Sequence, residues 1–162
     1  MAQTLQDRSR ESSPLTMVIC TFTLVLIFLF SVFNLRIVYC CGPSMLPAIA
    51  DGGFYLARDI DSSKDTLHRG DILVFHPNPD TQIAYVKRVV GLPGDHLISN
   101  SGYLTVNDQY FDYIPDAGTW ISCVPPGHIY FMGDNRDHSA DSRVFGCIPE
   151  KLVVAKILFR IV

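Results

Sequence analysis

A long apolar segment close to the N-terminus constrains this chain more than any other feature. Residues 12–35 contain no Asp, Glu, Lys or Arg, and the core at residues 15–33 reads LTMVICTFTLVLIFLFSVF. As a helix, this core would extend about 28 Å at roughly 1.5 Å per residue, close to the hydrocarbon thickness of a bilayer. The segment therefore predicts one membrane-spanning helix, over residues 15–38.

Two other kinds of apolar N-terminal segment fit less well. A cleaved signal peptide has an apolar region of about 7–15 residues and small residues at its cleavage site, whereas the bulky run NLRIVYCC follows this segment. A lipoprotein signal would need a small residue before its cysteine, but Tyr39 precedes Cys40. A retained helix is therefore the interpretation that the sequence favours.

The charges that flank the segment predict its orientation. Arg8 and Arg10 precede it and Arg36 follows it, so the positive-inside rule favours a cytoplasmic tail at residues 1–14. The domain at residues 39–162 would then lie on the outer side of the membrane. Acidic residues in the tail argue against a mitochondrial transit peptide, because such peptides are poor in acidic residues.

The domain after the segment has the pattern of a β fold. Glycine and proline turn signals separate short runs rich in β-branched and aromatic residues, which predict strands. These runs are residues 54–57, 71–75, 83–91, 103–107, 128–133 and 153–162. We expect a mainly β fold with barrel-like or coiled sheets, and a short hairpin extension at residues 95–127, where the spacing of the runs is least regular.

Charge and cysteine content narrow the classes of function. The formal net charge is −3, and no run of basic residues is present, so we expect no nucleic-acid partner. None of the 5 cysteines belongs to the C-x-x-C pattern of a zinc site. A Cys123–Cys147 disulfide stays open, because its formation depends on a distance that sequence does not give.

Three segments carry residues suited to catalysis. GPSMLP at residues 42–47 places Ser44 in a turn, and the strand-like run at residues 84–95 places Tyr85 and Lys87 on one face. A lysine in apolar surroundings has a lowered pKa and becomes a general base, although a surface lysine that covers an apolar edge fits the same pattern. The polar loop GDNRDHSADSRVFG at residues 133–146 is suited to orienting such a base. Together they provide a nucleophile, a base and a support.

These segments, in this order, resemble the type I signal peptidases, which remove signal peptides from exported proteins. The chain contains S-M-x-P, R-G-D-I-x-x-F, K-R-V-x-G-x-P-G-D and G-D-N-R-D-x-S-x-D-S-R-x-x-G after its apolar segment. The last two motifs are long and specific. The resemblance implies a membrane-bound serine endopeptidase that acts on preprotein signal peptides with no metal, cofactor or obligate partner subunit.

The resemblance also implies roles for individual residues. Ser44 would be the nucleophile, with its backbone N–H in the oxyanion hole, and Lys87 the base. Ser139 would hydrogen-bond and orient the Lys87 amine, while Asp141 and Arg143 would pair to support the loop. Four further residues would line shallow apolar pockets for a small-x-small sequence such as Ala-x-Ala, and these are Met45, Ile49, Tyr85 and Val86.

The chain departs from the family pattern at a few positions. Gly42 stands where many relatives have a serine that helps the oxyanion hole, His138 replaces a common asparagine, and Ala48 replaces a frequent threonine. The expected nucleophile, Ser44, and the expected base, Lys87, are both present. The chain is short, which leaves the range of substrates open.

Three alternatives stay open at this stage. A Ser-His-Asp hydrolase would use His138, but there is no G-x-S-x-G elbow. An inactive, membrane-tethered relative would bind apolar peptides without cutting them. The mitochondrial inner-membrane peptidases share the anchor and the Ser/Lys pair, whereas the wording of the polar loop is more bacterial, which favours the plasma membrane.

Overall fold

The computed structural model describes residues 13–78, 83–114 and 118–162. Most of the expected tail at residues 1–14 lies outside the described residues. The chain divides into two compact units, Met1–Leu35 and Arg36–Val162, which we describe separately.

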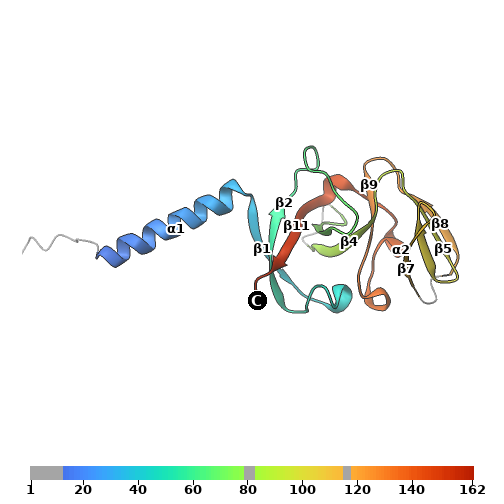
Figure 1. Ribbon diagram of the computed structural model, residues 1–162, viewed down its shortest axis with the longest axis horizontal. Helices are drawn as coiled ribbons and strands as arrows, with labels where there is room; N and C mark the ends of the chain where they lie inside the picture. The colour runs from blue at the N-terminus through green and yellow to red at the C-terminus, as the bar shows by residue number, and fades with distance from the viewer. Residues whose placement is uncertain (1–12, 79–82, 115–117) are drawn as a thin grey trace, which may run out of the picture. The chain divides into compact units, whose positions relative to one another are not determined.

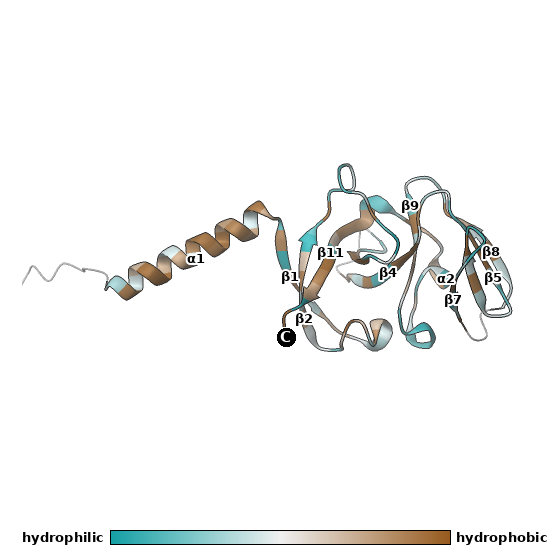
Figure 2. Ribbon diagram, in the orientation of Figure 1, coloured by the Kyte–Doolittle hydropathy of each residue, from teal (hydrophilic) through white to brown (hydrophobic). Residues whose placement is uncertain are grey.

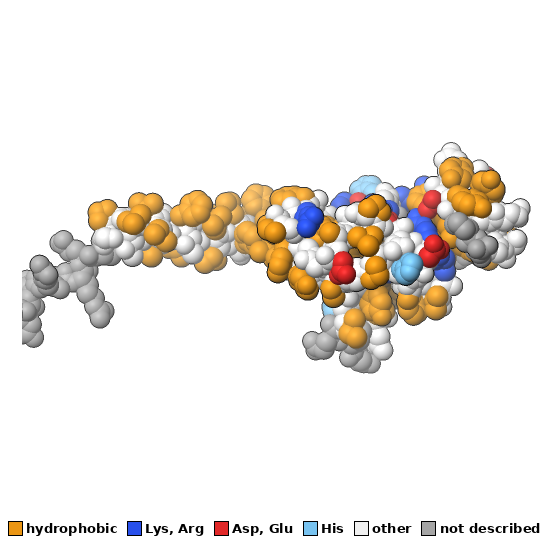
Figure 3. All heavy atoms as spheres, turned by 90° about the horizontal axis from the view of Figure 1, so that it is seen from below, with side chains coloured by type: hydrophobic (Ala, Val, Ile, Leu, Met, Phe, Trp, Pro, Cys, Tyr) orange, Lys and Arg blue, Asp and Glu red, His pale blue; other side chains and the backbone are white. Residues whose placement is uncertain are grey.

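The first unit contains the helix α1 (Pro14–Val32). Ser13 caps its N-terminus, because the Ser13 Oγ accepts a hydrogen bond from the Thr16 N–H at 3.2 Å, and Pro14 occupies the first turn. No residue of α1 is buried. Most of its residues are hydrophobic (Figure 2), and hydrophobic side chains lie along its surface in Figure 3. Among the described residues, α1 is the one helix that is long and apolar enough to cross a bilayer. The predicted apolar helix is therefore confirmed.

The predicted C-terminal boundary of this helix, at residue 38, is wrong. The helix ends at Val32, and Asn34 has a φ of 50°, a left-handed conformation that stops helices. The strand β1 (Leu35–Cys40) follows and lies beside β2 (Gly53–Asp59). β1 leaves the helical conformation because its backbone pairs with β2, and an ion pair between Arg36 and Asp59 joins the two strands.

The second unit is built on a seven-stranded sheet with the order β1-β2-β11-β3-β4-β9-β10 (Figure 1). Its other strands are β3 (Ile72–Phe75), β4 (Tyr85–Gly91), β9 (His128–Met132), β10 (Ile148–Pro149) and β11 (Val153–Arg160). The pairs from β2 to β10 along this order are antiparallel. Register shifts in β11 and β4 are the irregularities that bend strands and let a sheet coil.

The expected hairpin extension at residues 95–127 is a second sheet, with the order β7-β6-β5-β8. Its strands are β5 (His96–Asn100), β6 (Tyr103–Val106), β7 (Gln109–Tyr113) and β8 (Trp120–Cys123). Leu97, Leu104 and Val106 on its inner face pack with Tyr130 and Met132 of β9. The extension is therefore an integral part of the core, and the mainly β prediction is confirmed.

Short elements around the large sheet bring the candidate site together. The 3₁₀ helix η1 (Pro43–Met45) follows β1, and its Met45 packs in a core cluster with Val74 of β3. Two further 3₁₀ helices, η2 (Arg136–His138) and η3 (Glu150–Leu152), and the helix α2 (Ser142–Phe145) lie in the connections after β9. Ser44 therefore enters the site from η1, Lys87 from β4, and the polar loop from the C-terminal end of β9.

Candidate active site

A short, fixed turn presents the Ser44 side chain. Gly42 precedes η1 with a φ of 98°, a conformation that glycine adopts without steric cost. The Gly42 N–H donates a hydrogen bond of 2.7 Å to Asp51 Oδ1. On the other side of the turn, the Asn135 N–H donates to the Ser44 carbonyl at 3.0 Å. The backbone around Ser44 is therefore held from two segments.

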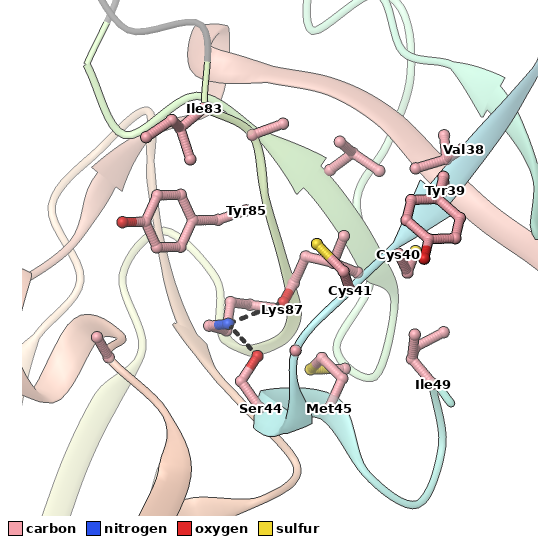
Figure 4. Close-up of a pocket in the computed structure, with 15 residues that line it drawn as sticks. Val38, Tyr39, Cys40, Cys41, Ser44, Met45, Ile49, Ile83, Tyr85 and Lys87 are labelled. Carbon is pink, nitrogen blue, oxygen red and sulfur yellow. Dashed lines mark hydrogen bonds between the residues drawn. The ribbon is translucent and has the colours of Figure 1, made fainter. Parts of the chain in front are cut away.

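Lys87 lies in β4, with β3 and β9 on either side of that strand, and its side chain is only 3% exposed. Its Nζ donates hydrogen bonds to Ser44 Oγ at 2.7 Å and to the Val86 carbonyl at 3.0 Å (Figure 4). The Tyr85 ring centroid lies 5.7 Å from the same Nζ. The alternative of a surface lysine is therefore wrong, because the neighbouring strands and η1 enclose the side chain.

The surroundings of the Lys87 amine act on its charge. Burial lowers the pKa of Lys87, because removal from water disfavours the ammonium form, and the nearby Asp141 carboxylate offsets part of that effect. The net shift is downward. A larger share of neutral amine is therefore present near neutral pH than in an exposed lysine, and a neutral amine is what a general base requires.

Asp141 and Arg143 form the predicted ion pair. Arg143 Nε donates to Asp141 Oδ1 at 2.9 Å, and Arg143 Nη2 donates to Asp141 Oδ2 at 3.0 Å. Asp141 is fully buried, and its carboxylate also accepts the Gly133 N–H at 3.0 Å. Burial raises the pKa of Asp141, but the hydrogen bonds from Arg143 and Gly133 outweigh it and leave the pKa below its usual value. The pair therefore holds the polar loop in shape.

Ser139 does not form the hydrogen bond to Lys87 that the resemblance implied. The Ser139 Oγ is shielded from solvent, and no group in the part of the chain that the structure describes meets it in hydrogen-bond geometry, although the hydroxyl contributes to the lowered pKa of Asp141. The Lys87 amine is oriented instead by the Val86 carbonyl and by Ser44. The Ser139 side chain packs against Gly133, where a Cβ atom would lie 2.5 Å from Ser139 Cβ. Backbone geometry, which sequence does not specify, decides which polar group reaches the amine.

A cavity of about 360 Å³ opens beside the Ser44–Lys87 pair. The four expected pocket residues, Met45, Ile49, Tyr85 and Val86, all line it, and the first three are labelled in Figure 4. The sequence analysis missed the other wall residues, which are Val38, Tyr39, Cys40, Cys41, Gly42, Val74, Ile83, Ala84 and Ala140. Of these residues, Val38 had been assigned to the end of the predicted helix, and the others belong to the domain at residues 39–162, where no pattern in the sequence marked them. The lining of the cavity is mainly apolar.

Asn135 is a further residue that the sequence analysis did not single out. Its Nδ2 donates to the Pro43 carbonyl at 3.1 Å, and its N–H donates to the next carbonyl, that of Ser44. Two consecutive carbonyls of the nucleophile turn are thus bound by one residue of the polar loop. In the sequence, the one indication was that Asn135 lies inside the longest motif. Its role is seen only in its hydrogen bonds to the Pro43 and Ser44 carbonyls.

Gly133→Ala should lower kcat by about 10- to 100-fold with little change in KM, because small misplacements of reacting groups cost about that much. A Cβ at this position would lie 2.5 Å from both the Ser44 carbonyl oxygen and Ser139 Cβ, and would push the nucleophile turn away from Lys87. Steady-state kinetics of peptide-bond cleavage would measure the effect. Gly127→Ala is the control, since it strains a backbone with a φ of 68° but meets nothing within 4 Å. Equal losses of kcat in both variants would contradict the steric argument.

Several charged motif residues form ion pairs that brace the strands. Arg69 binds Asp95 through both carboxylate oxygens, with Arg69 Nη2 2.9 Å from each. Arg88 binds Asp134 in the same manner, at 2.8 Å from Nε to Oδ1 and 2.6 Å from Nη2 to Oδ2. The second pair ties the residue after Lys87 to the start of the polar loop. These motif residues therefore position the site and do not enter it.

The structure does not support the histidine alternative. His138 is exposed, and its Nδ1 lies 3.3 Å from Asn135 Oδ1, whereas Ser44 Oγ is bonded to Lys87. All five cysteines, including Cys123 and Cys147, are free thiols, so the open disulfide is not formed. Within the described residues, no group of His, Cys, Asp and Glu side chains is placed to hold a metal ion.

A family model and the sequences of known relatives agree on one family. Residues 15–162 match the family model described as "Signal peptidase, peptidase S26". The chain is 32% identical over 163 residues to a probable signal peptidase I-1 of Synechocystis sp., covering 93% of this chain and 81% of that protein. It is 31% identical over 166 residues to signal peptidase I of Bacillus caldolyticus, covering 91% and 87%. A crystal structure of a signal peptidase I from Enterococcus faecalis V583 aligns with a TM-score of 0.46 at 26% identity, covering 55% of this chain and 94% of that one.

Proposed function

Because the chain belongs to the signal peptidase family, peptidase S26, we propose that it cleaves signal peptides from exported preproteins with Ser44 as nucleophile and Lys87 as general base. Membership of this family makes the protein a hydrolase of the serine protease class, and α1 is compatible with membrane anchoring. The observation that carries the residue assignment is the 2.7 Å contact between Lys87 Nζ and Ser44 Oγ beside an apolar cavity.

The first half of the proposed reaction forms an acyl-enzyme. The neutral Lys87 amine accepts the Ser44 hydroxyl proton across the existing contact while Ser44 Oγ attacks the scissile carbonyl carbon. The tetrahedral intermediate then collapses, and the C–N bond breaks. The leaving amine takes the proton from the Lys87 ammonium, so the mature protein departs and the signal peptide stays bound to Ser44 as an ester.

The second half of the reaction repeats these roles with water. Lys87 accepts a proton from a water molecule while the water oxygen attacks the ester carbon. Lys87 then gives this proton to Ser44 Oγ when the ester bond breaks. In both halves the developing oxyanion needs donors. The Ser44 N–H is suited to this role, because it lies in the first turn of η1, where N–H groups lack partners within the helix. One such donor is worth about 3–4 kcal/mol.

We further propose that the cavity binds small side chains of an Ala-x-Ala sequence. Met45, Tyr85 and Val86 line the cavity beside Ser44 with mainly apolar surface, which suits the methyl side chains of such a sequence. The anchor would keep the site near membrane-inserted signal peptides.

We propose a plasma-membrane location with the β unit on the outer side. The basic residues Arg8 and Arg10 before α1 favour a cytoplasmic N-terminus under the positive-inside rule. Exported preproteins present their cleavage sites on that outer side. A mitochondrial inner-membrane location is the alternative. The proposed topology can be tested with a tag on the C-terminus: protease added to intact bacterial cells should digest the tag if the β unit lies on the outer side, and should leave it intact if the β unit lies inside.

The test of the function is cleavage of a preprotein with an Ala-x-Ala site, in detergent, by the wild-type chain and by Ser44→Ala. We expect the wild type to cut after the second Ala and Ser44→Ala to leave the substrate intact while retaining its fold. A substrate with Leu in place of the second Ala is the matched control and should not be cut. A folded wild-type chain that binds but never cuts this substrate would instead indicate a peptide-binding relative.

A further inference from the structure

The aromatic ring of Tyr85 is the wall of the site next to the Lys87 amine. It lines the cavity, and its centroid lies 5.7 Å from Lys87 Nζ (Figure 4). Tyr85 is only partly buried, so the packing of its own strand does not fully enclose the ring. Its position over the amine therefore depends on the side chains that touch the ring from other elements.

Two phenylalanines contact this ring. Phe75 of β3 stacks on it with centroids 6.1 Å apart, and Phe75 is itself packed at 4.5 Å from Phe131 in the core. Phe145, the last residue of α2, meets the ring edge-on at 6.3 Å and an interplanar angle of 77°. Edge-to-face contact is one of the arrangements that aromatic pairs prefer. Tyr85 is therefore held between a core residue and a residue of the polar loop.

The ion pair that shapes the polar loop also places Phe145. Asp141 caps α2, since its Oδ1 accepts the Arg143 N–H at 3.2 Å, and the Asp141 carbonyl accepts the Phe145 N–H at 3.0 Å. α2 is a single turn, so the position of Phe145 follows directly from that of Asp141. Phe145 is 48% exposed, so its ring is covered in part, and the contact with the Tyr85 ring lies on its covered side.

We propose that Phe145 is a positioning residue for the signal peptidase reaction, whose edge contact holds the Tyr85 ring over the Lys87 amine and keeps water away from it. The proposal deepens the proposed function and rests on Lys87 as the base. Without the Phe145 ring, Tyr85 would rotate toward solvent, and the amine would gain water contact on that side.

We expect the other groups around the amine to stay in place when Phe145 is replaced. Ser44 faces it from η1, and Leu73 pairs with Lys87 across β3. Among the described residues, the charged side chain that acts on the amine is Asp141, which remains paired with Arg143. Arg88, the next charged residue along β4, is bound to Asp134 of the polar loop. A change in the titration of Lys87 would therefore report the loss of shielding by Tyr85.

The test uses the full chain in detergent and compares Phe145→Ala with Phe145→Tyr and Val144→Ala. Val144 precedes Phe145 in α2 and is 73% exposed, which makes it the matched control. Phe145→Ala should shift the acid limb of kcat/KM upward by roughly 0.5 to 1 pH unit. Phe145→Tyr, which keeps the ring edge, should restore the wild-type profile, and Val144→Ala should leave it unchanged.

A second measurement separates this proposal from the proposed function. In a Ser44→Ala background, the pH dependence of Lys87 acylation by an amine-selective reagent, read by mass spectrometry, reports the amine without any proteolysis. Phe145→Ala should shift this curve upward, and Phe145→Tyr should not. If the labelling curve moves but cleavage depends on another base, the proposed function fails and the positioning role stands. A labelling curve unchanged by Phe145→Ala, or moved equally by Val144→Ala, overturns the positioning role.

Discussion

Replacement of Lys87 by Met should reduce preprotein cleavage to background while the β unit stays folded. A general base contributes about 10²- to 10⁴-fold to rate, and loss of one member of a catalytic pair can cost as much as loss of all of them. Met matches the length of the buried stem and leaves no unpaired charge beside Val86 and Ser44. The measurement is kcat/KM with thermal unfolding in parallel. More than a tenth of the wild-type activity in Lys87→Met would contradict the assignment of Lys87 as base.

The same residue predicts the pH dependence of activity and stability. Since burial lowers the pKa of Lys87 in the folded chain, the wild type should lose activity as the pH falls through that folded pKa. Between the folded and unfolded pKa values the unfolded chain binds the extra proton, so stability should rise with pH across this window. Lys87→Met should abolish this rise and be relatively more stable at low pH. A pH–rate profile that is flat from about pH 5 to 9 would contradict a titrating lysine base.

Asp141→Asn should lower the free energy of unfolding by about 3–5 kcal/mol, the range for breaking a buried ion pair on one side. The carboxylate is fully buried and accepts hydrogen bonds from Arg143 and from the Gly133 N–H. An amide of the same size would place its NH₂ group, a donor, against the N–H groups of either Arg143 or Gly133. It would also leave Arg143 without its counter-charge. Urea unfolding measures the change. Asp137→Asn, at an exposed position of the same loop, is the control and should cost little.

The contribution of Asp141 to stability also depends on pH, but through a carboxyl group that is stabilised in its charged form. The pKa of Asp141 is lowered in the folded chain, so its stabilising effect is present above the unfolded value of about 3.9 and is lost as the pH falls through the folded pKa. The stability gap between wild type and Asp141→Asn should therefore narrow in acid. A gap under about 1 kcal/mol at neutral pH would mean that the pair does not hold the loop, because even exposed pairs reach that value.

Local patterns predicted the parts of the fold whose structure depends on nearby residues. The apolar segment formed α1, and each of the six predicted strand runs contains a strand of the structure. The helix boundary was wrong because the strand conformation of Leu35–Cys40 comes from its pairing with β2, which is not encoded in its own hydropathy. Three further missed strands, at residues 96–100, 109–113 and 120–123, are short, and neighbouring strands supply their pairing.

The sequence by itself determined the apolar helix, the β class and the motifs that identify the family, because periodicity, β-branched content and motif wording are properties of consecutive residues. Only the tertiary structure decided that Lys87 is buried against Ser44, that Asn135 binds the nucleophile turn, and that Ser139 does not reach the amine. These contacts join residues that lie tens of positions apart in the chain. Their distances, and hence the charge state of the amine, follow from how the strands pack.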